Sequence, residues 1–336
     1  MTRKSSSTEE TALATYLIQR VLASIPVLIA VSFLTFSFVV LTSDPLAQLR
    51  QNRNLSFETV EKVKQEKHLE EPFVVRYGYW VKEAVTEGFG TTILGDRPIW
   101  PELKRVLGNT LQLVVVAEIL ALLLGIGMGV YSAVRQYSTF DYVTTSASFL
   151  GLAFPLFWLA LMLQILVTNI YVNWDIRLFY TAQLSSPDPG SGIHFLLDRV
   201  QHLALPWLTL MVVNIAVYSR FTRAAMLEVF GSDYVRTARG KGIAERRVVM
   251  KHTLRNALIP VTVVAALNFG ALLGGSIVTE TIFALDGMGL YFINALGTGD
   301  PYPIMAWLMV TAVMIIVANL IADVALSLLD PRVRLG

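Results

Sequence analysis

The sequence contains no cysteine, and only 15% of its 336 residues are charged. Without cysteine the chain has no disulfide bonds and no thiolate for catalysis or metal binding. Its four histidines, at positions 68, 194, 202 and 252, are scattered and show no spacing of metal ligands. Soluble domains usually carry about 25% charged residues. A soluble chain with 54% hydrophobic residues would expose apolar patches that it could not hide, so the composition points to a membrane protein.

Motifs of nucleotide and hydrolase sites are also missing. The phosphate-binding pattern G-x-x-x-x-G-K-[ST] does not occur, and the stretch ARGKG at 238–242 has neither its spacing nor a preceding strand. Neither H-E-x-x-H nor G-x-S-x-G is found, and Ser276 in GGSIV lacks an obvious histidine partner in a later apolar segment. We therefore expect a chain without catalysis of its own, without a bound cofactor or metal, and without a nucleic-acid partner.

Long apolar segments are what the sequence does have. Six of them are long enough to cross about 30 Å of hydrocarbon at about 1.5 Å per residue. The first has too long an apolar run for a signal peptide and no small-residue cleavage site after it, so we expect it to be an uncleaved span. The expected spans are 17–41, 109–134, 143–171, 201–222, 260–283 and 303–328.

The distribution of positive charge predicts which side each loop faces. The stretch 220–259 carries nine Lys or Arg and three acidic residues, so the loop 223–259 is expected in the cytoplasm. The N-terminal extension 1–16 and the tail 329–336 then lie on the same side, and the loops 42–108, 172–200 and 284–302 lie outside. The first of these has ten basic and ten acidic residues, but loops longer than about 60 residues largely escape the positive-inside rule.

The long external loop, 42–108, is expected to form a small folded unit. Ser56 to His68 has the pattern of an amphipathic helix, and Gly88–Pro98 is rich in turn residues. Pattern alone does not separate a soluble unit from one lying on the membrane. The residues expected to contact its core are Phe57, Val60, Val63 and Val74.

A few charged residues fall inside the expected spans, where each costs about 2.5–3.5 kcal/mol on insertion scales. Glu118 and Glu280 are expected to make structural hydrogen bonds, with a proton or substrate relay as the alternative. Asp323 lies seven residues before Asp330, about 10 Å into the membrane, and Arg20 is expected at a comparable depth. We expect Arg20 and Asp323 to pair.

Glycines are spaced closely within two of the spans. Gly125, Gly127 and Gly129 allow neighbouring helices to approach, as do Gly270, Gly274 and Gly275. Packing is the expected role, and a hinge or a pathway wall is the alternative.

The inner loop is expected to contain two helical pieces. Asp233 is expected to cap a helix that runs through Arg239 and ends at Gly240 and Gly242. A second helix is expected over 244–258. It would carry a basic stripe of Arg247, Lys251 and Arg255 beside an apolar stripe of Met250, Leu254 and Leu258. Like charges at this spacing repel, so the stripe needs anionic lipid or an acidic partner. Topology alone would not require two helices, which favours docking.

At this point a resemblance becomes visible. DYVRTARGKGIAERRVVMKHTLRNALIP, at 233–260, resembles the cytoplasmic signature of ATP-binding-cassette (ABC) importer permeases, more narrowly the dipeptide/oligopeptide/nickel branch. The E-A-A and G positions of this signature correspond here to Arg236, Thr237, Ala238 and Gly242. Arg and Thr therefore replace the Glu and the first Ala of the signature. YLIQRVLASIPVLIAVSFLTF, FGTTILGDRPIWPELKRVLGNTLQL and the terminal DPRVRLG resemble the B-type subunit of the branch, whereas the extension 1–15 departs from it.

The resemblance implies an all-α integral membrane protein with six transmembrane helices and the type I importer fold, with both termini inside. It implies a second permease subunit, two ATPase subunits that bind ATP and Mg, and an external substrate-binding protein. The role of coupling helix, docking in a cleft of the ATPase, is carried over by resemblance to a set of eight residues. These are Asp233, Tyr234, Arg236, Thr237, Ala238, Arg239, Lys241 and Gly242.

Other interpretations stay open on the sequence. A secondary transporter or channel working alone would predict an internal repeat and clustered intramembrane charges, which are not evident. An intramembrane enzyme is disfavoured by the missing motifs. For an importer, short peptides are the expected solute, and nickel, glutathione or another small solute are alternatives.

Overall fold

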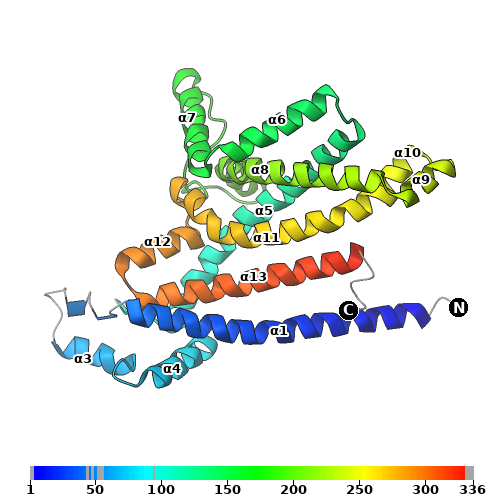
Figure 1. Cartoon of the computed structure of the whole chain (residues 1–336). Coiled ribbons are helices and arrows are strands. Elements are labelled where there is room, and N and C mark those ends of the chain that lie inside the picture. Colours follow the sequence, from blue (N-terminus) through cyan, green and yellow to red (C-terminus); the bar gives the residue numbers. More distant parts are fainter. Residues whose placement is uncertain (1–3, 43–44, 47–48, 51–56, 94, 330–336) are drawn as a thin grey trace.

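The computed structural model describes residues 4–42, 45–46, 49–50, 57–93 and 95–329. Helices account for nearly all of this, and the described residues form no strand beyond an isolated bridge between Thr91 and Pro98. Long helices lie side by side along one axis, and the beginning of the first helix and the end of the last helix lie near the same end of the bundle (Figure 1). The helices are α1 (Lys4–Thr42), α3 (Phe57–Glu66), α4 (Phe73–Thr86), α5 (Ile99–Val134), α6 (Thr139–Ala153), α7 (Leu156–Trp174), α8 (Ile193–Phe230), α9 (Asp233–Gly240), α10 (Glu245–Arg247), the π-helix η1 (Val248–Thr253), α11 (Leu254–Ile282), α12 (Met288–Thr298) and α13 (Pro301–Leu329).

Six of the described helical stretches are long and apolar enough to cross a membrane. Several helices extend beyond the limits expected from hydropathy, since α5 begins at Ile99 rather than 109 and α8 continues to Phe230 rather than 222. Hydropathy locates only the part that fits hydrocarbon, whereas a helix can continue into water with polar residues. The six stretches are Ile18–Thr42, Ile99–Val134, Leu156–Trp174, Ile193–Phe230, Glu245–Leu273 and Pro301–Ser327.

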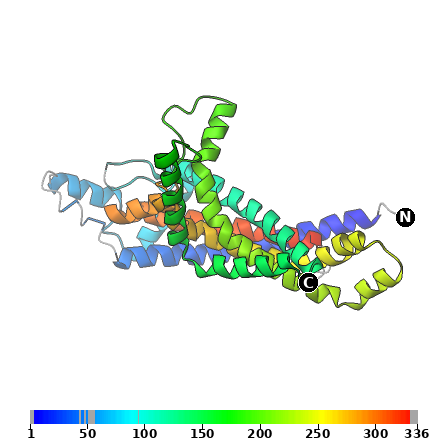
Figure 2. The same ribbon diagram turned by 90° about the horizontal axis from the view of Figure 1, so that it is seen from above.

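The segment expected as one span over 143–171 consists of two helices. α6 ends at Ala153, Phe154 is extended with ψ of 131°, and Pro155 precedes the first residue of α7. Proline disfavours helical conformation in the residue before it and has no backbone N–H to donate, so the helix stops there. In both views α7 runs across the direction of the long helices (Figures 1 and 2).

The helix expected over 244–258 is likewise not a separate element. α10, η1 and α11 follow one another without a gap, and α11 continues through Pro260 to Ile282. Proline is tolerated inside membrane helices because neighbouring groups satisfy the freed carbonyl. The inner loop is therefore a short helix, a turn and the beginning of a long helix.

Close packing of α5 on α8 forms the centre of the bundle. A Cβ atom on Gly125 would lie 2.7 Å from Cβ of Tyr218, and one on Gly129 would lie 2.6 Å from the backbone oxygen of Ser219. Gly127 has no neighbouring atom within 4 Å of such a Cβ. Two of the three glycines thus permit the approach of α8, as expected for small residues four apart.

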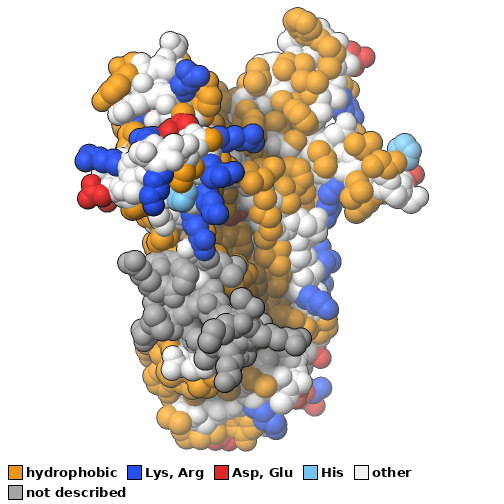
Figure 3. All heavy atoms as spheres, turned by 90° about the vertical axis from the view of Figure 1, so that its right-hand side faces the viewer, with side chains coloured by type: hydrophobic (Ala, Val, Ile, Leu, Met, Phe, Trp, Pro, Cys, Tyr) orange, Lys and Arg blue, Asp and Glu red, His pale blue; other side chains and the backbone are white. Residues whose placement is uncertain are grey.

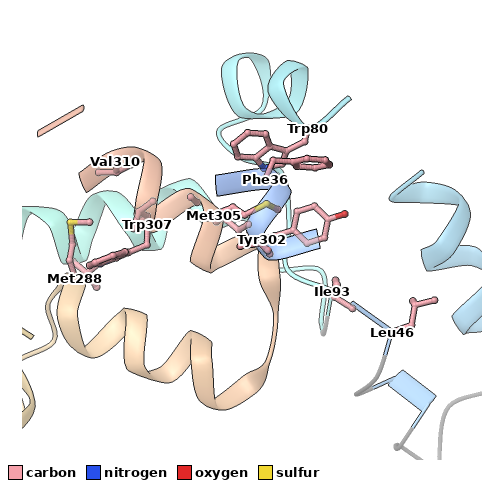
Figure 4. Close-up of a cluster of buried hydrophobic side chains, with 14 of the residues drawn as sticks. Phe36, Leu46, Trp80, Ile93, Met288, Tyr302, Met305, Trp307 and Val310 are labelled. Carbon is pink, nitrogen blue, oxygen red and sulfur yellow. The ribbon is translucent and has the colours of Figure 1, made fainter. Parts of the chain in front are cut away.

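The far end of the bundle holds an aromatic-rich core. Phe36 of α1 packs against Trp80 of α4, with ring centroids 5.6 Å apart, and Met288 and Tyr302 from α12 and α13 join the same cluster (Figure 4). Rings at this distance add attraction to the area they bury. The external loop is thus held on the bundle through α4.

Half of the residues expected to contact this core do so. Val60 and Val63 of α3 pack against it. Phe57 and Val74 were expected there too, but they are 83% and 71% exposed. Both lie in the first two residues of a helix, where hydrophobicity alone does not tell which side faces the bundle.

Candidate functional site

The candidate site is the helix α9, which lies at one end of the bundle between α8 and α11 (Figure 1). Ser232, with extended backbone, precedes it, and its hydroxyl donates to the carbonyl of Val229 at 2.6 Å rather than capping the helix. Asp233 was expected to cap but is the first helical residue, and α9 has no side-chain cap bond. A carboxylate in the first turn still interacts favourably with the positive end of a helix.

One face of α9 is anchored in a small apolar cluster. Val235 and Ala238, three residues apart, are buried against Val248 of η1. Side chains at this spacing share a helix face. Of the eight residues expected to dock on a partner, Ala238 therefore faces the chain itself and holds the helix in place.

A charged clamp closes the turn after α9. Arg239 Nη2 and Nε donate to the two carboxylate oxygens of Glu245 at 2.6 and 3.1 Å, and the guanidinium also lies 5.2 Å from the ring centroid of Phe230. The hydrogen bonds that Arg239 donates to the Glu245 carboxylate raise the pKa of Arg239 above its usual value. Such bidentate pairs fix geometry as well as charge, so the clamp sets the direction in which the chain leaves α9.

Gly242 gives this turn its shape. Its φ is +71°, in the left-handed region that residues with a Cβ rarely adopt. No atom lies within 4 Å of the position a Cβ would take, so backbone conformation rather than close contact requires glycine here.

The opposite face of α9 points outward and carries mixed charge. Asp233 and Arg236 form a loose pair at 3.8 Å, with side chains 99% and 72% exposed. Thr237 donates to the carbonyl of Asp233 at 2.8 Å, and Lys241 is exposed at the end of the helix. Pairs this exposed contribute little to stability, so these side chains can meet another protein without unfolding α9.

Tyr234 lies at the side of α9 and links it to α11. The amide of Asn256 donates to the Tyr234 hydroxyl at 2.7 Å, and Tyr234 is 45% exposed. Asn256 is a contact that the sequence did not predict, because it lies 22 residues along the chain.

Basic side chains extend the surface beyond α9. Arg247, Lys251 and Arg255 are exposed, as is Met250, which was expected in an apolar stripe. Figure 3, which looks onto this end, shows Lys and Arg side chains gathered beside a hollow lined by hydrophobic side chains. The end of the molecule that carries α9 thus presents a positive surface.

A cavity of about 540 Å³ adjoins this surface between α9 and the turn joining α5 to α6. Arg239 and Glu245 line one side, and Gln136 and Tyr137 line the other. It has room for side chains of a docked partner.

A second ion pair, between Arg223 and the buried carboxylate of Asp141, holds the same turn to α8. Arg223 donates to Asp141 at 2.6 Å through Nε and 2.9 Å through Nη2, while Ser132 and the backbone of Tyr137 also donate to this carboxylate. The guanidinium holds the pKa of Asp141 well below its usual range. Because α8 leads directly into α9, this pair joins the site to the helices of the bundle.

The pair that was expected from the sequence joins the first and last helices. Arg20 Nε of α1 lies 3.3 Å from a carboxylate oxygen of Asp323 of α13, with side chains 53% and 16% exposed. The two residues are far from α9 in sequence and form no part of the candidate docking surface.

This arrangement suits mechanical docking. Among the described residues no group of three or more His, Asp or Glu could hold a metal ion. The sequence did not reveal Glu245 as the partner of Arg239, or Asp141 as the partner of Arg223. In neither pair does the separation along the chain follow the period of a helix or a strand.

Comparison with known proteins gives matches over nearly the whole chain. A family model described as "Binding-protein-dependent transport system inner membrane component" matches residues 125–335, and the N-terminal model of such membrane components matches residues 13–98.

Curated relatives align from end to end. The chain is 39% identical over 326 residues to the oligopeptide transport system permease protein AppB of Bacillus subtilis, covering 96% of this chain and 100% of AppB. It is 38% identical over 325 residues to OppB of Mycobacterium tuberculosis H37Rv, covering 96% and 99%. It is 34% identical over 336 residues to the dipeptide permease DppB of Escherichia coli K12, covering 95% and 98%.

A solved structure shares the fold. A chain of the MetNI methionine ABC transporter, in inward-facing conformation, superimposes with a TM-score of 0.54 at 18% identity. The match covers 70% of this chain and 99% of that chain, and it supports the type I importer fold expected from the sequence.

Proposed function

This chain belongs to the family of binding-protein-dependent transport system inner membrane components, and we propose that it forms half of the translocation pathway of an ATP-driven importer of short peptides. Its six membrane-spanning helices make it a multi-pass membrane protein of an ABC importer. Relatives that match it from end to end are named as oligopeptide and dipeptide permeases, which supports peptides as the solute.

The proposed assembly has the composition usual for this family. A second, related permease forms the other half of the pathway, two ATPase subunits bind ATP and Mg, and an external binding protein delivers the peptide. The site of action is the bacterial cytoplasmic membrane, with the end that carries α9 in the cytoplasm. The positive surface of this end supports that orientation.

The observation that carries the coupling role is the two-sided construction of α9. Its inner face is fixed by Val235 and Ala238, and its outer face exposes Asp233, Arg236 and Thr237. In the proposal the outer face lies in a cleft of the ATPase. Closure of the ATPases on ATP then moves α9, and the clamp and the Asp141–Arg223 pair pass this displacement to the spans. The coupling requires contacts that differ between the two states.

Charge reversal at Arg236 tests this proposal. R236E changes an exposed side chain that makes only a loose surface pair with Asp233, so the fold should survive. We expect peptide uptake and co-purification of the ATPase subunits to fall at least about tenfold, equivalent to about 1.4 kcal/mol. The control is K62E on α3, which reverses a charge that is also 72% exposed. Wild-type uptake and ATPase binding in R236E would contradict the assignment.

A further inference from the structure

A groove of about 300 Å³ lies between α5, α11 and α13, away from α9. Its walls are apolar and built largely from small side chains, including Ala265, Ala266 and Ala322. Ile119 and Ile321, which are 51% and 64% exposed, form part of the lining, so the groove opens at the surface of the chain. The volume is at the lower end of the range for small-molecule sites, about 300–1,000 Å³.

Glu118 is the acidic residue in this lining. It lies near the middle of α5 and is only 5% exposed. The hydroxyl of Tyr218, a fully buried residue of α8, donates to Oε1 of Glu118. The other carboxylate oxygen, Oε2, is buried and has no hydrogen-bond partner among the described residues.

A buried carboxylate oxygen without a partner costs free energy, and the cost is higher for a charged group. The groove is apolar apart from the Glu118 carboxyl and the Thr262 hydroxyl, which donates to the carbonyl of Leu258, so a ligand that enters the groove can bring the missing donor. A divalent cation would need several oxygen ligands, which this lining does not supply. An ammonium ion attached to a small apolar group supplies donors, positive charge and a body that suits the alanine-lined wall.

We propose that this groove binds a primary ammonium ion carried on a short apolar group, and that the N-terminus of a transported peptide supplies it. The inference rests on the proposed peptide substrate and adds a subsite to it. Oε2 of Glu118 accepts from the ammonium, Tyr218 keeps the carboxylate in place, and the first side chain of the peptide lies against Ala265 and Ala322. Acidic residues inside membrane spans commonly mark substrate pathways.

Binding to the purified assembled transporter, reconstituted without its binding protein, tests the site. The probes are n-butylammonium, trialanine and N-acetyltrialanine, which has lost the ammonium. We expect the wild type to bind the first two at least about tenfold more tightly than the acetylated peptide, as for a hydrogen bond to a charged group. E118Q should bind butylammonium and trialanine about tenfold more weakly and leave acetylated-peptide binding unchanged.

Two further variants keep the result interpretable. A322L adds bulk to the groove wall while residue 118 stays Glu, and it should weaken the binding of both butylammonium and trialanine. E58Q makes the same chemical change as E118Q on the exposed face of α3 and should bind like the wild type. Assembly by size-exclusion chromatography checks that each variant folds. Equal binding by E118Q and wild type, or equal binding of acetylated and free peptide, overturns the proposal.

Uptake by the wild-type transporter separates this inference from the proposed function. If the wild type takes up peptide and E118Q binds the probes as tightly as the wild type, the proposed subsite is wrong and the importer assignment stands. If the wild type takes up no peptide but binds butylammonium in a way that depends on Glu118, the groove is a site for ammonium ions. In that case a peptide is neither its occupant nor the transported substrate.

Discussion

Two glycines set how closely α5 approaches α8. Gly125 faces Tyr218, and Gly129 faces Ser219 and Thr222, each at a distance that leaves no room for a Cβ. The approach also lets Tyr218 reach Glu118 across the same helix pair. These residues therefore serve packing and the position of a buried carboxyl together.

Replacing Gly129 by alanine should destabilise the protein. The new Cβ would lie 2.6 Å from both the backbone oxygen of Ser219 and Cβ of Thr222, so α8 has to move. Overpacking of this kind costs about 1–3 kcal/mol. The matched control is G127A, where a Cβ meets nothing within 4 Å and alanine favours the helix. The thermal unfolding midpoint in detergent should fall for G129A alone, and equal midpoints for the two variants would contradict this packing.

Among the elements, α9 combines a fixed inner face with a defined exit. Val235 and Ala238 hold the helix on η1, and the Arg239–Glu245 clamp and Gly242 turn the chain back towards α11. A docked helix can transmit force only if it does not rotate freely against its own subunit. The clamp and the turn supply that constraint in this protein.

Substitution of Gly242 should separate backbone conformation from side-chain contact. Valine is strained at φ of +71°, whereas asparagine tolerates the left-handed region, and neither meets a neighbouring atom at Cβ. We expect G242V to reduce ATP-dependent uptake severalfold and G242N to retain most of it, measured in vesicles with equal amounts of assembled transporter. If G242N lost as much uptake as G242V, a contact with the partner rather than the turn would explain the glycine.

The elements also show what the sequence could and could not predict. Six apolar segments and the helix from Asp233 follow from composition and period, which are local properties. The break at Phe154–Pro155 was not expected, because proline is tolerated in the membrane helix α11, where Pro260 causes no break. Tertiary contacts decide between these outcomes. For the same reason the clamp partner Glu245 had no signal in the sequence.

On the scale of the whole molecule, contacts lead from α9 into the bundle. α9 follows α8, Arg223 of α8 holds Asp141 at the start of α6, and α8 packs along α5. The groove with Glu118 lies on the α5 side of this packing, facing α11 and α13. A displacement of α9 therefore reaches the wall of the proposed ammonium site through helices in direct contact.

The ion pair between Arg20 and Asp323 should couple the first helix to the last. α1 packs along α13, and this pair adds a charge contact at 3.3 Å to their apolar interface. We expect R20A and D323A each to lower the free energy of unfolding, and the double variant to lose less than the sum. The interaction energy should be about 0.5 kcal/mol, at the low end for contacting residues, because Arg20 is half exposed. Thermal unfolding of all four proteins measures it, and strictly additive losses would mean that α1 is held on α13 by apolar packing alone.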